Sequence, residues 1–407
     1  MKQRIDIDQL RPGMRIDKLD RPWIATPFLR HRKVVTSVDE IEKLRACGVR
    51  ILEVTMEDGE EEPAWHSEAM PGPVPLLPEA AQEPAVTSPP VSFEEELPVA
   101  RQIYKAAKTV IEDAMRDVRM GGAINMEAVT RVVTDMTDSV LRHPDALSSL
   151  ARLKRFDEYT FYHSVNTALL AMSLGRALAL EPTALHQLGV GMLLHDIGKT
   201  KIPLDLLNKP GRFEPQEFEL MKQHVMRGAE VLSDMSGLAE ASLKPALEHH
   251  ERVDGSGYPH RRQRSEISQF GLIAAVVDIY DALTSDRCYH RAKPAHETLQ
   301  YLYLISQRGH LDHALVQRFI KVIGIYPVGS IVQMNTGELG IVRRLHHDAP
   351  LEPLVVLVKG PGQTLLPRPQ EIDLRNQTGT PYRNIALVKD AVTTGLNPGL
   401  YLDSESL

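Results

Sequence analysis

Seven residues that can bind metal ions are spread between positions 163 and 278. His195 and Asp196 are adjacent and follow an apolar run, and His249 and His250 form a second adjacent pair. The other three are His163, His224 and Asp278. Imidazole and carboxylate together bind borderline and hard divalent metals, and seven such groups exceed what one ion needs. The pattern predicts a two-metal site in a helical bundle.

The order of these groups along the chain suggests how they converge. Two divalent ions held close together need a bridging carboxylate, and Asp196 is central enough to serve. Adjacent His249 and His250 would point about 100° apart on a regular helix, so both can face one cavity only near a helix end. The glycine-rich stretch from Asp254 supplies that end. A metal-free buried pair remains the alternative for His195 and Asp196 taken alone.

Apolar periodicity predicts helices around these groups, joined by short connectors that contain proline or glycine. The predicted helices span residues 157–180, 182–195, 215–232, 238–250, 271–283 and 294–305. Two amphipathic helices precede them, one from Pro98 to Gly121 and one from Met126 to His143. We expect both to pack against the bundle, and His143 to end its helix rather than bind metal.

The rest of the chain divides by composition, and the predicted fold is mainly α with smaller mixed and β parts. Residues 57–97 combine many prolines with acids and lack Lys and Arg, which favours an extended tether; a proline-rich recognition ligand is the alternative. The predicted units are a small α+β module (1–56), an acidic proline-rich linker (57–97), a helical connector (98–146), a catalytic bundle (147–325) and a β-rich C-terminal subdomain (326–407). We expect strands at 34–35 and 49–54 and a helix at 38–46 in the module, and strands at 331–334, 339–343 and 354–358 in the subdomain.

Composition limits the partners. A net charge of −7 gives no general attraction to nucleic acid or to anionic lipid, so a phosphate-bearing substrate would need locally placed cations. Cys47 and Cys288 are far apart and suggest neither a disulfide framework nor a cysteine metal site. The N-terminus lacks a signal-peptide pattern, and no apolar run approaches the roughly 18 residues that a membrane span requires. We therefore predict a cytoplasmic protein without membrane insertion.

Several of these segments form motifs that resemble the HD-GYP family of HD-domain phosphohydrolases, whose members hydrolyse cyclic di-GMP. The segments are Leu194-His195-Asp196-Ile197-Gly198-Lys199, the run His249-His250-Glu251 to Gly257-Tyr258-Pro259, and Val277-Asp278 to Asp286-Arg287. The resemblance covers residues 150–325 and implies the metal ligands His163, His195, Asp196, His224, His249, His250 and Asp278. The first module and linker resemble an uncharacterised region that often precedes this domain.

The resemblance also implies roles in the reaction. Lys199 would give a proton or a neutralising charge to the departing ribose oxygen, and Asp281, one helical turn after Asp278, would orient that lysine. Gly257, Tyr258 and Pro259 match the signature loop, with Tyr258 positioned to stack on guanine. Arg287 matches an arginine that binds phosphate, provided that the helix ends near Leu283-Thr284 and the chain turns back. Relatives have proline and often a basic residue where this chain has Cys288 and His290, so a second phosphate contact is in doubt.

The chemistry of the candidate ligands limits which metal ions the site is expected to bind. Two divalent ions are expected, with iron or manganese favoured and zinc or nickel as alternatives. Some relatives bind a third ion with a glutamate four residues before the first histidine, where this chain has Tyr159, preceded by Glu158. The sequence leaves a third ion open.

The sequence thus predicts a phosphodiesterase that converts cyclic di-GMP to pGpG and on to GMP with a hydroxide bridging two metals. Diguanylate cyclase domains or other signalling proteins are conceivable partners, and nucleic acid is not. One alternative is a module that senses cyclic di-GMP, or docks a partner, with little turnover. Another is a hydrolase of a different cyclic dinucleotide.

Overall fold

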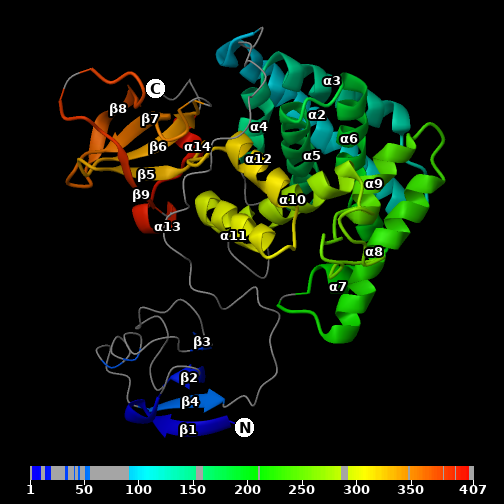
Figure 1. The fold of residues 1–407 in the computed structure, drawn as a ribbon, viewed down its shortest axis with the longest axis horizontal. Helices are drawn as coiled ribbons and strands as arrows, with labels where there is room; N and C mark the ends of the chain where they lie inside the picture. The colour runs from blue at the N-terminus through cyan, green and yellow to red at the C-terminus, as the bar shows by residue number, and fades with distance from the viewer. Residues whose placement is uncertain are drawn as a thin grey trace. The chain divides into compact units, whose positions relative to one another are not determined.

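The computed structural model consists of two compact units, residues 1–73 and 74–407. It describes residues 2–10, 14–19, 33–34, 41, 45, 51–55, 91–152, 159–209, 211–285, 292–346, 349–378, 380–389 and 391–402. The predicted fold class, mainly α with a small N-terminal module and a C-terminal β subdomain, is confirmed (Figure 1).

The first unit contains an antiparallel sheet in the order β1-β4-β2-β3, and Ile7, Leu10 and Ile16 are buried in this unit. Its strands are β1 (Lys2–Asp6), β2 (Arg15–Leu19), β3 (Lys33–Val34) and β4 (Ile51–Thr55). Strands near 34 and 51–54 agree with the prediction, whereas β1 and β2 were not predicted because charged side chains dilute their apolar signal. The helix predicted at 38–46 lies mostly outside the described residues.

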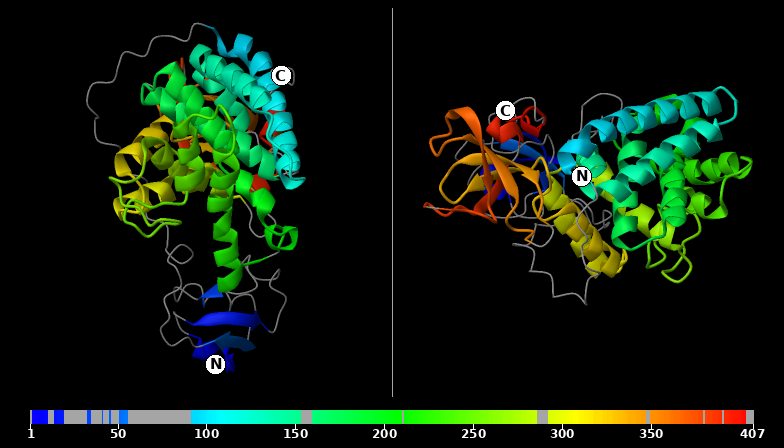
Figure 2. Two further views of the ribbon diagram at one scale, coloured as in Figure 1. Left: turned by 90° about the vertical axis from the view of Figure 1, so that its right-hand side faces the viewer. Right: turned by 90° about the horizontal axis from the view of Figure 1, so that it is seen from above.

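The second unit begins with a helical body. Its long helices are α2 (Phe93–Arg119), α3 (Met126–Arg142), α4 (Pro144–Arg152), α5 (Tyr159–Ala177), α6 (Pro182–Leu194), α8 (Pro215–Ser233), α9 (Glu240–Glu248), α10 (Gln269–Thr284), α11 (Ala295–Gln307) and α12 (His313–Ile323). A 3₁₀ turn, η3 (Ile197–Lys201), and the short α7 (Leu204–Leu207) join α6 to α8. Helices α5 and α10 and the second half of α6 are buried on nearly all sides, which requires continuous apolar sequence rather than a stripe. Figure 2 shows the helical body from two further directions.

Helices α2 and α3 belong to the same hydrophobic core as the rest of the body. Ala107 and Ile111 of α2 and Val133 and Met136 of α3 are buried in one cluster with residues of α5, α6 and α10. His143 ends α3, as predicted. The boundary predicted at 146/147 falls inside α4, so the connector and the bundle share one folded body.

Helix α2 begins at Phe93 rather than at Pro98, and the predicted linker therefore extends too far. Ser92 is the N-cap: its hydroxyl accepts a hydrogen bond from the Glu95 amide, and the Glu95 carboxylate accepts one from the Ser92 amide. This reciprocal capping box fixes a helix start. The signal was present in the sequence as Ser92-x-x-Glu95.

The C-terminal part is a five-stranded antiparallel sheet in the order β8-β7-β6-β5-β9. Its strands are β5 (Ile331–Met334), β6 (Leu339–Arg344), β7 (Leu354–Lys359), β8 (Leu365–Asp373) and β9 (Ile385–Lys389), followed by short helices α13 (Ala391–Thr394) and α14 (Gly399–Leu402). The predicted strands match β5, β6 and β7. The edge strands β8 and β9 are largely exposed and were not predicted. Prolines and charged residues interrupt β8, whereas the apolar run at the start of β9 was a local signal that was overlooked.

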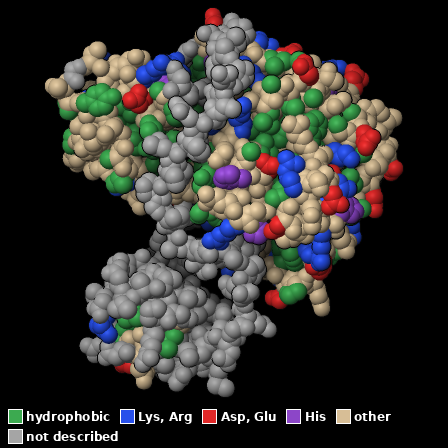
Figure 3. Space-filling model, in the orientation of Figure 1, with side chains coloured by type: hydrophobic (Ala, Val, Ile, Leu, Met, Phe, Trp, Pro, Cys, Tyr) green, Lys and Arg blue, Asp and Glu red, His purple; other side chains and the backbone are tan. Residues whose placement is uncertain are grey.

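Lys, Arg, Asp and Glu side chains are interspersed over the visible face of the helical body, in keeping with the modest net charge (Figure 3). Within the described residues, no helix has both the length and the apolarity to cross a bilayer.

Candidate metal centre

The end of α6 brings Asp196 to the centre of the helical body. His195 is the C-cap of α6, and the chain then tightens into η3 against α8. A side chain at Gly198 would overlap the carbonyl oxygen of His224 and the amide of Gly228, so glycine is needed for this close approach. The contact places the His195–Asp196 pair beside the α8 histidine.

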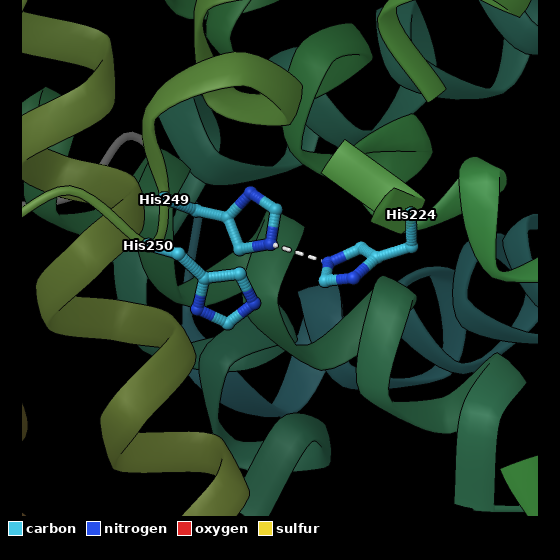
Figure 4. A group of neighbouring side chains, drawn as sticks. All are labelled: His224, His249 and His250. Carbon is cyan, nitrogen blue, oxygen red and sulfur yellow. Dashed lines mark hydrogen bonds between the residues drawn. The ribbon is translucent and has the colours of Figure 1, made fainter. Parts of the chain in front are cut away.

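The end of α9 directs two adjacent histidines into the same space. Helix α9 ends at Glu248 and His249 is its C-cap, in agreement with the prediction that a helix end lets both rings face one cavity. The rings of His249 and His250 have centroids 4.0 Å apart. Figure 4 shows these two rings and that of His224 pointing toward one another.

Asp196 lies between two groups of ligands. Its Oδ2 is 3.5 Å from the Nε2 atoms of both His163 and His195. Its Oδ1 is 3.6 Å from Nε2 of His224 and 3.8 Å from Nε2 of His249. The two carboxylate oxygens therefore face different histidines, the arrangement expected of a bridging ligand.

The remaining ligands complete each side. We call His163, His195 and Asp278 the first ligand group and His224, His249 and His250 the second; the ligand atoms of each group lie within 4.8 Å of one another. In the first group, Nε2 of His163 is 3.1 Å from Oδ1 of Asp278. All seven predicted ligands are thus brought together by α5, α6, α8, α9 and α10.

Hydrogen bonds from the Nδ1 atoms orient four of the imidazoles. Nδ1 of His195, His224 and His249 bonds the carbonyl oxygens of Met192, Met221 and Pro245 at 2.7, 2.7 and 2.8 Å. His163 Nδ1 bonds Asp281 Oδ2 at 2.7 Å. A carbonyl oxygen only accepts, so Nδ1 carries the proton and the Nε2 lone pair faces the centre. Such outer hydrogen bonds are typical of metal-binding histidines.

Several buried polar atoms at the centre are arranged to bind a cation rather than to form hydrogen bonds with one another. His195 Nε2 and Asp196 Oδ1 are buried without a hydrogen-bond partner. The Nε2 atoms of His224 and His249 are 3.4 Å apart (Figure 4), although both carry lone pairs. That spacing suits two nitrogens bound to one ion at about 2.1 Å each. The residues present therefore fit divalent metals.

Burial and charge set the protonation of the ligands. Burial lowers the pKa of His224 and of His249 to about 4 and that of His250 well below its usual value, so these rings are neutral and able to bind metal. Burial opposes ionisation of Asp196, but Lys199 and the surrounding histidines outweigh it and lower its pKa. For Asp278, His163 similarly outweighs burial and lowers the pKa.

The predicted catalytic pair has different partners from those the sequence suggested. Lys199 Nζ lies 2.5 Å from Asp196 Oδ2 and is partly exposed. Asp281 was expected to orient Lys199, but the structure pairs its Oδ2 with His163. Lys199 thus lies at the centre, and Asp281 lies behind a ligand.

The signature loop packs directly on the second ligand group. The Tyr258 ring stacks on His250, with centroids 4.5 Å apart, and the Tyr258 amide donates to the His250 carbonyl at 3.1 Å. A side chain at Gly257 would overlap the backbone of Glu251. The Tyr258–Pro259 bond is cis. The structure therefore places Tyr258, between Gly257 and Pro259, against His250 of the second ligand group.

A buried carboxylate holds the backbone of the signature loop. The two oxygens of the buried Glu251 accept hydrogen bonds from the amides of His260 and Arg262 at 2.7 and 2.9 Å. Because both carboxylate oxygens of Glu251 accept hydrogen bonds from the loop backbone, the loop forms a fixed turn beside the candidate ligands.

Some predictions fall outside the described residues. These are the placements of Arg287, Cys288 and His290, and the question of Glu158 or the Tyr159 side chain at a third ion. Helix α10 does end at Thr284, as predicted, and Ser285 is extended.

Two residues of α8 beside the loop were not predicted. The ring of Phe218, 42% exposed, has its centroid 6.2 Å from that of Tyr258. Lys222 Nζ lies 4.9 Å from the Phe218 ring centroid and 5.6 Å from that of Tyr258. Spaced four residues apart on one helix, they form an aromatic and cationic rim with Tyr258. No pattern in the sequence marked Phe218, because its exposure and its contact with Tyr258 arise only in the fold.

Known proteins share this chain's organisation. An HD domain profile matches residues 132–315, and a profile for a domain of unknown function (DUF3391) matches residues 2–129. The chain is 35% identical over 373 residues to a cyclic di-GMP phosphodiesterase of Pseudomonas aeruginosa, covering 91% of this chain and 88% of the relative. It is 34% identical over 190 residues to a cyclic di-GMP phosphodiesterase of Thermotoga maritima, covering 46% and 51%.

A third relative differs in its named substrate. The chain is 33% identical over 161 residues to a 3′3′-cGAMP-specific phosphodiesterase of Vibrio cholerae, covering 39% of this chain and 30% of the relative. The likeness to the Pseudomonas protein extends over most of both chains. The protein therefore belongs to the HD-GYP family of HD-domain phosphodiesterases and carries a DUF3391 region ahead of its HD domain.

Proposed function

We propose that the protein hydrolyses cyclic di-GMP to pGpG, and pGpG further to GMP, at a centre of two divalent ions. The observation that carries this proposal is Asp196, whose two oxygens face the first and second ligand groups separately. The near full-length relative is named for cyclic di-GMP. Iron or manganese is favoured because the candidate ligands combine imidazole and carboxylate groups.

The chain's own residues divide the work. His163, His195, Asp196 and Asp278 would hold one ion, and Asp196, His224, His249 and His250 the other. Two ions bound there would activate water and neutralise charge on the phosphate oxygens. Lys199, beside Asp196 and partly exposed, would protonate or neutralise the departing ribose 3′-oxygen.

The rim of Phe218, Lys222 and Tyr258 would position the substrate. Aromatic rings offer stacking surfaces to a purine base. The Lys222 ammonium group supplies a positive charge near the second ligand group, which a dianionic substrate needs on a chain of net charge −7. Gly257 lets the loop pack closely against the backbone of Glu251 and Arg252.

Reconstitution tests this proposal. Chelator-treated protein, loaded under anaerobic conditions with Fe²⁺ or Mn²⁺, is incubated with cyclic di-GMP and the products are separated by chromatography. We expect metal-dependent formation of pGpG and then GMP, and none from Asp196→Ala. Intact cyclic di-GMP at every metal loading would refute catalysis, and binding without turnover would favour the sensing role instead.

Substrate choice is tested in the same assay. Cyclic di-GMP and 3′3′-cGAMP, offered together, give the ratio of kcat/KM directly. We expect cyclic di-GMP to be consumed first. Faster loss of 3′3′-cGAMP would transfer the proposal to the substrate named for the Vibrio relative.

Lys199 has a test that separates its role from metal binding. Lys199→Met keeps the length of the side chain and removes its charge. We expect both ions to remain and kcat to fall by about a hundredfold or more. Unchanged kcat with both ions bound would exclude Lys199 as the acid.

A further inference from the structure

A chain of hydrogen bonds connects the first ligand group to α2. The Tyr104 hydroxyl donates to Asn166 Oδ1 at 2.7 Å, and Asn166 Nδ2 donates to Asp281 Oδ1 at a longer 3.4 Å. Asp281 Oδ2 bonds His163 Nδ1 at 2.7 Å. Of the residues linked by these hydrogen bonds, Tyr104 belongs to α2, Asn166 and His163 belong to α5, and Asp281 belongs to α10.

The direction of each bond is fixed by the next. The amide oxygen of Asn166 can only accept, so the Tyr104 hydroxyl must donate, and the amide nitrogen then faces Asp281. The Asp281 carboxylate accepts on both oxygens, so His163 Nδ1 carries the proton. With a metal ion bound, His163 Nε2 would then present its lone pair on the side of Asp196 and Asp278, the form that binds metal.

Three of the four residues linked by these hydrogen bonds are buried. Asn166, Asp281 and His163 are 3% exposed or less, so water does not compete for their bonds. The Tyr104 ring is held by stacking on Tyr162, with centroids 6.2 Å apart and planes at 24°.

Helix α2 contacts the centre at a second place. Lys201 Nζ, in the η3 turn that carries Lys199, donates to the Val118 carbonyl at the end of α2 at 3.0 Å. The turn between Asp196 and α7 is therefore tied to the same helix. Because the HD profile begins at residue 132, α2 lies wholly within the DUF3391 match.

We propose that Tyr104 is a positioning residue of the metal centre, which acts through Asn166 and Asp281 on His163. The helix upstream of the HD domain thus completes the first ligand group. This inference rests on the metal centre of the proposed function, and concerns only one of its two ligand groups.

Metal affinity tests it on the full-length protein. Apoprotein is titrated with Mn²⁺ by calorimetry for the wild type, Tyr104→Phe, Asn166→Ala and the double variant. We expect Tyr104→Phe to weaken one of two binding steps about three- to tenfold, since outer partners of metal ligands are typically worth ten- to a hundredfold. The double variant should bind Mn²⁺ no more weakly than Asn166→Ala, because both substitutions interrupt the same series of hydrogen bonds.

Tyr162→Phe is the matched control, since it removes a hydroxyl from the ring stacked on Tyr104, and its affinities should equal those of the wild type. Equal weakening of both steps by Tyr104→Phe, paralleled by a lower Tm of the apoprotein, would mean a merely structural role and overturn the proposal. So would wild-type affinities in Tyr104→Phe. Wild-type protein that took up no Mn²⁺ would refute the inference. Protein that bound Mn²⁺ but left cyclic di-GMP intact would refute only the proposed function.

Discussion

The two ligand groups share Asp196 but are built differently. The first contains a second carboxylate, Asp278, and its His163 is backed by a third, Asp281. The second has only imidazoles besides Asp196, and backbone carbonyls orient His224 and His249. Carboxylates suit harder cations and imidazoles suit softer ones, so the two positions need not prefer the same metal.

Access to the two groups also differs. His163 and His195 are at most 1% exposed, whereas the side chain of His250 is 20% exposed and stacks on Tyr258. The aromatic and cationic rim lies on this second side. His224 and His249 are also at most 1% exposed, so the difference lies in the third residue of each group: the side chain of Asp278 is 11% exposed and that of His250 20%. The first group is thus the more closed and the more anionic, and the second is the more open and lies against the rim, so we expect substrate to enter over the second group.

Asp196→Ala gives the largest expected effect, because it removes the carboxylate that lies between the two groups. We expect the protein to lose at least one ion and turnover to fall about ten-thousandfold or more. Elemental analysis and product chromatography measure the two losses. A variant that kept two ions and a tenth of its activity would show that Asp196 bridges nothing.

Asp278→Ala and His250→Ala separate the groups. Each removes a ligand from one group only, so we expect each protein to keep about one ion and to lose turnover by about a thousandfold. Mn²⁺ titration should show a different step missing in each. Loss of the same step in both variants would mean that the groups form one site.

The sequence predicted what local patterns encode. The helix ends predicted at His195, at His250 and near Thr284 lie within two residues of those in the structure, because the apolar runs stop there. Lys199 lies three residues from Asp196, so its proximity to the centre also follows from local order.

Contacts between distant segments were not predictable in the same way. Asp281 lies 118 residues from His163, and no periodicity in either helix specifies that pairing over a pairing with Lys199. Phe218 and Lys222 read as ordinary residues of an amphipathic helix until the signature loop packs beside them. The start of α2 is the exception, since its capping box was local and was overlooked.

In the metal-free protein, acid should act in one direction on His224 and His249 and in the opposite direction on His163. Burial lowers the pKa of His195, so His195 has the sign of His224 and His249. The pKa values of His224 and His249 are lowered to about 4, so their stabilising contribution is present above pH 6.5 and is lost as the pH falls toward 4. Each contributes up to about 1.4 kcal/mol per pH unit in that window. His163 has the opposite sign: burial lowers its pKa, but the bonds to Asp278 and Asp281 outweigh burial and raise it, so its contribution is present at low pH.

Thermal unfolding of apoprotein between pH 8 and pH 5 measures this difference. We expect the Tm to fall below pH 6.5, and His224→Gln to show a shallower fall than the wild type. An identical slope in that variant would mean that other groups govern the acid response.

Phe218→Ala should have the smallest effect on turnover, and it should change only substrate binding beside the second ligand group. Loss of one stacking surface is worth about 1–3 kcal/mol per base, so we expect KM for cyclic di-GMP to rise about tenfold while both ions and kcat are kept. Met226→Ala is the control, because Met226 is similarly exposed on α8, at 40%. If Phe218→Ala left KM unchanged, or lowered kcat as Lys199→Met does, substrate would not enter over the second ligand group. The contrast between a closed and an open side would then describe packing only.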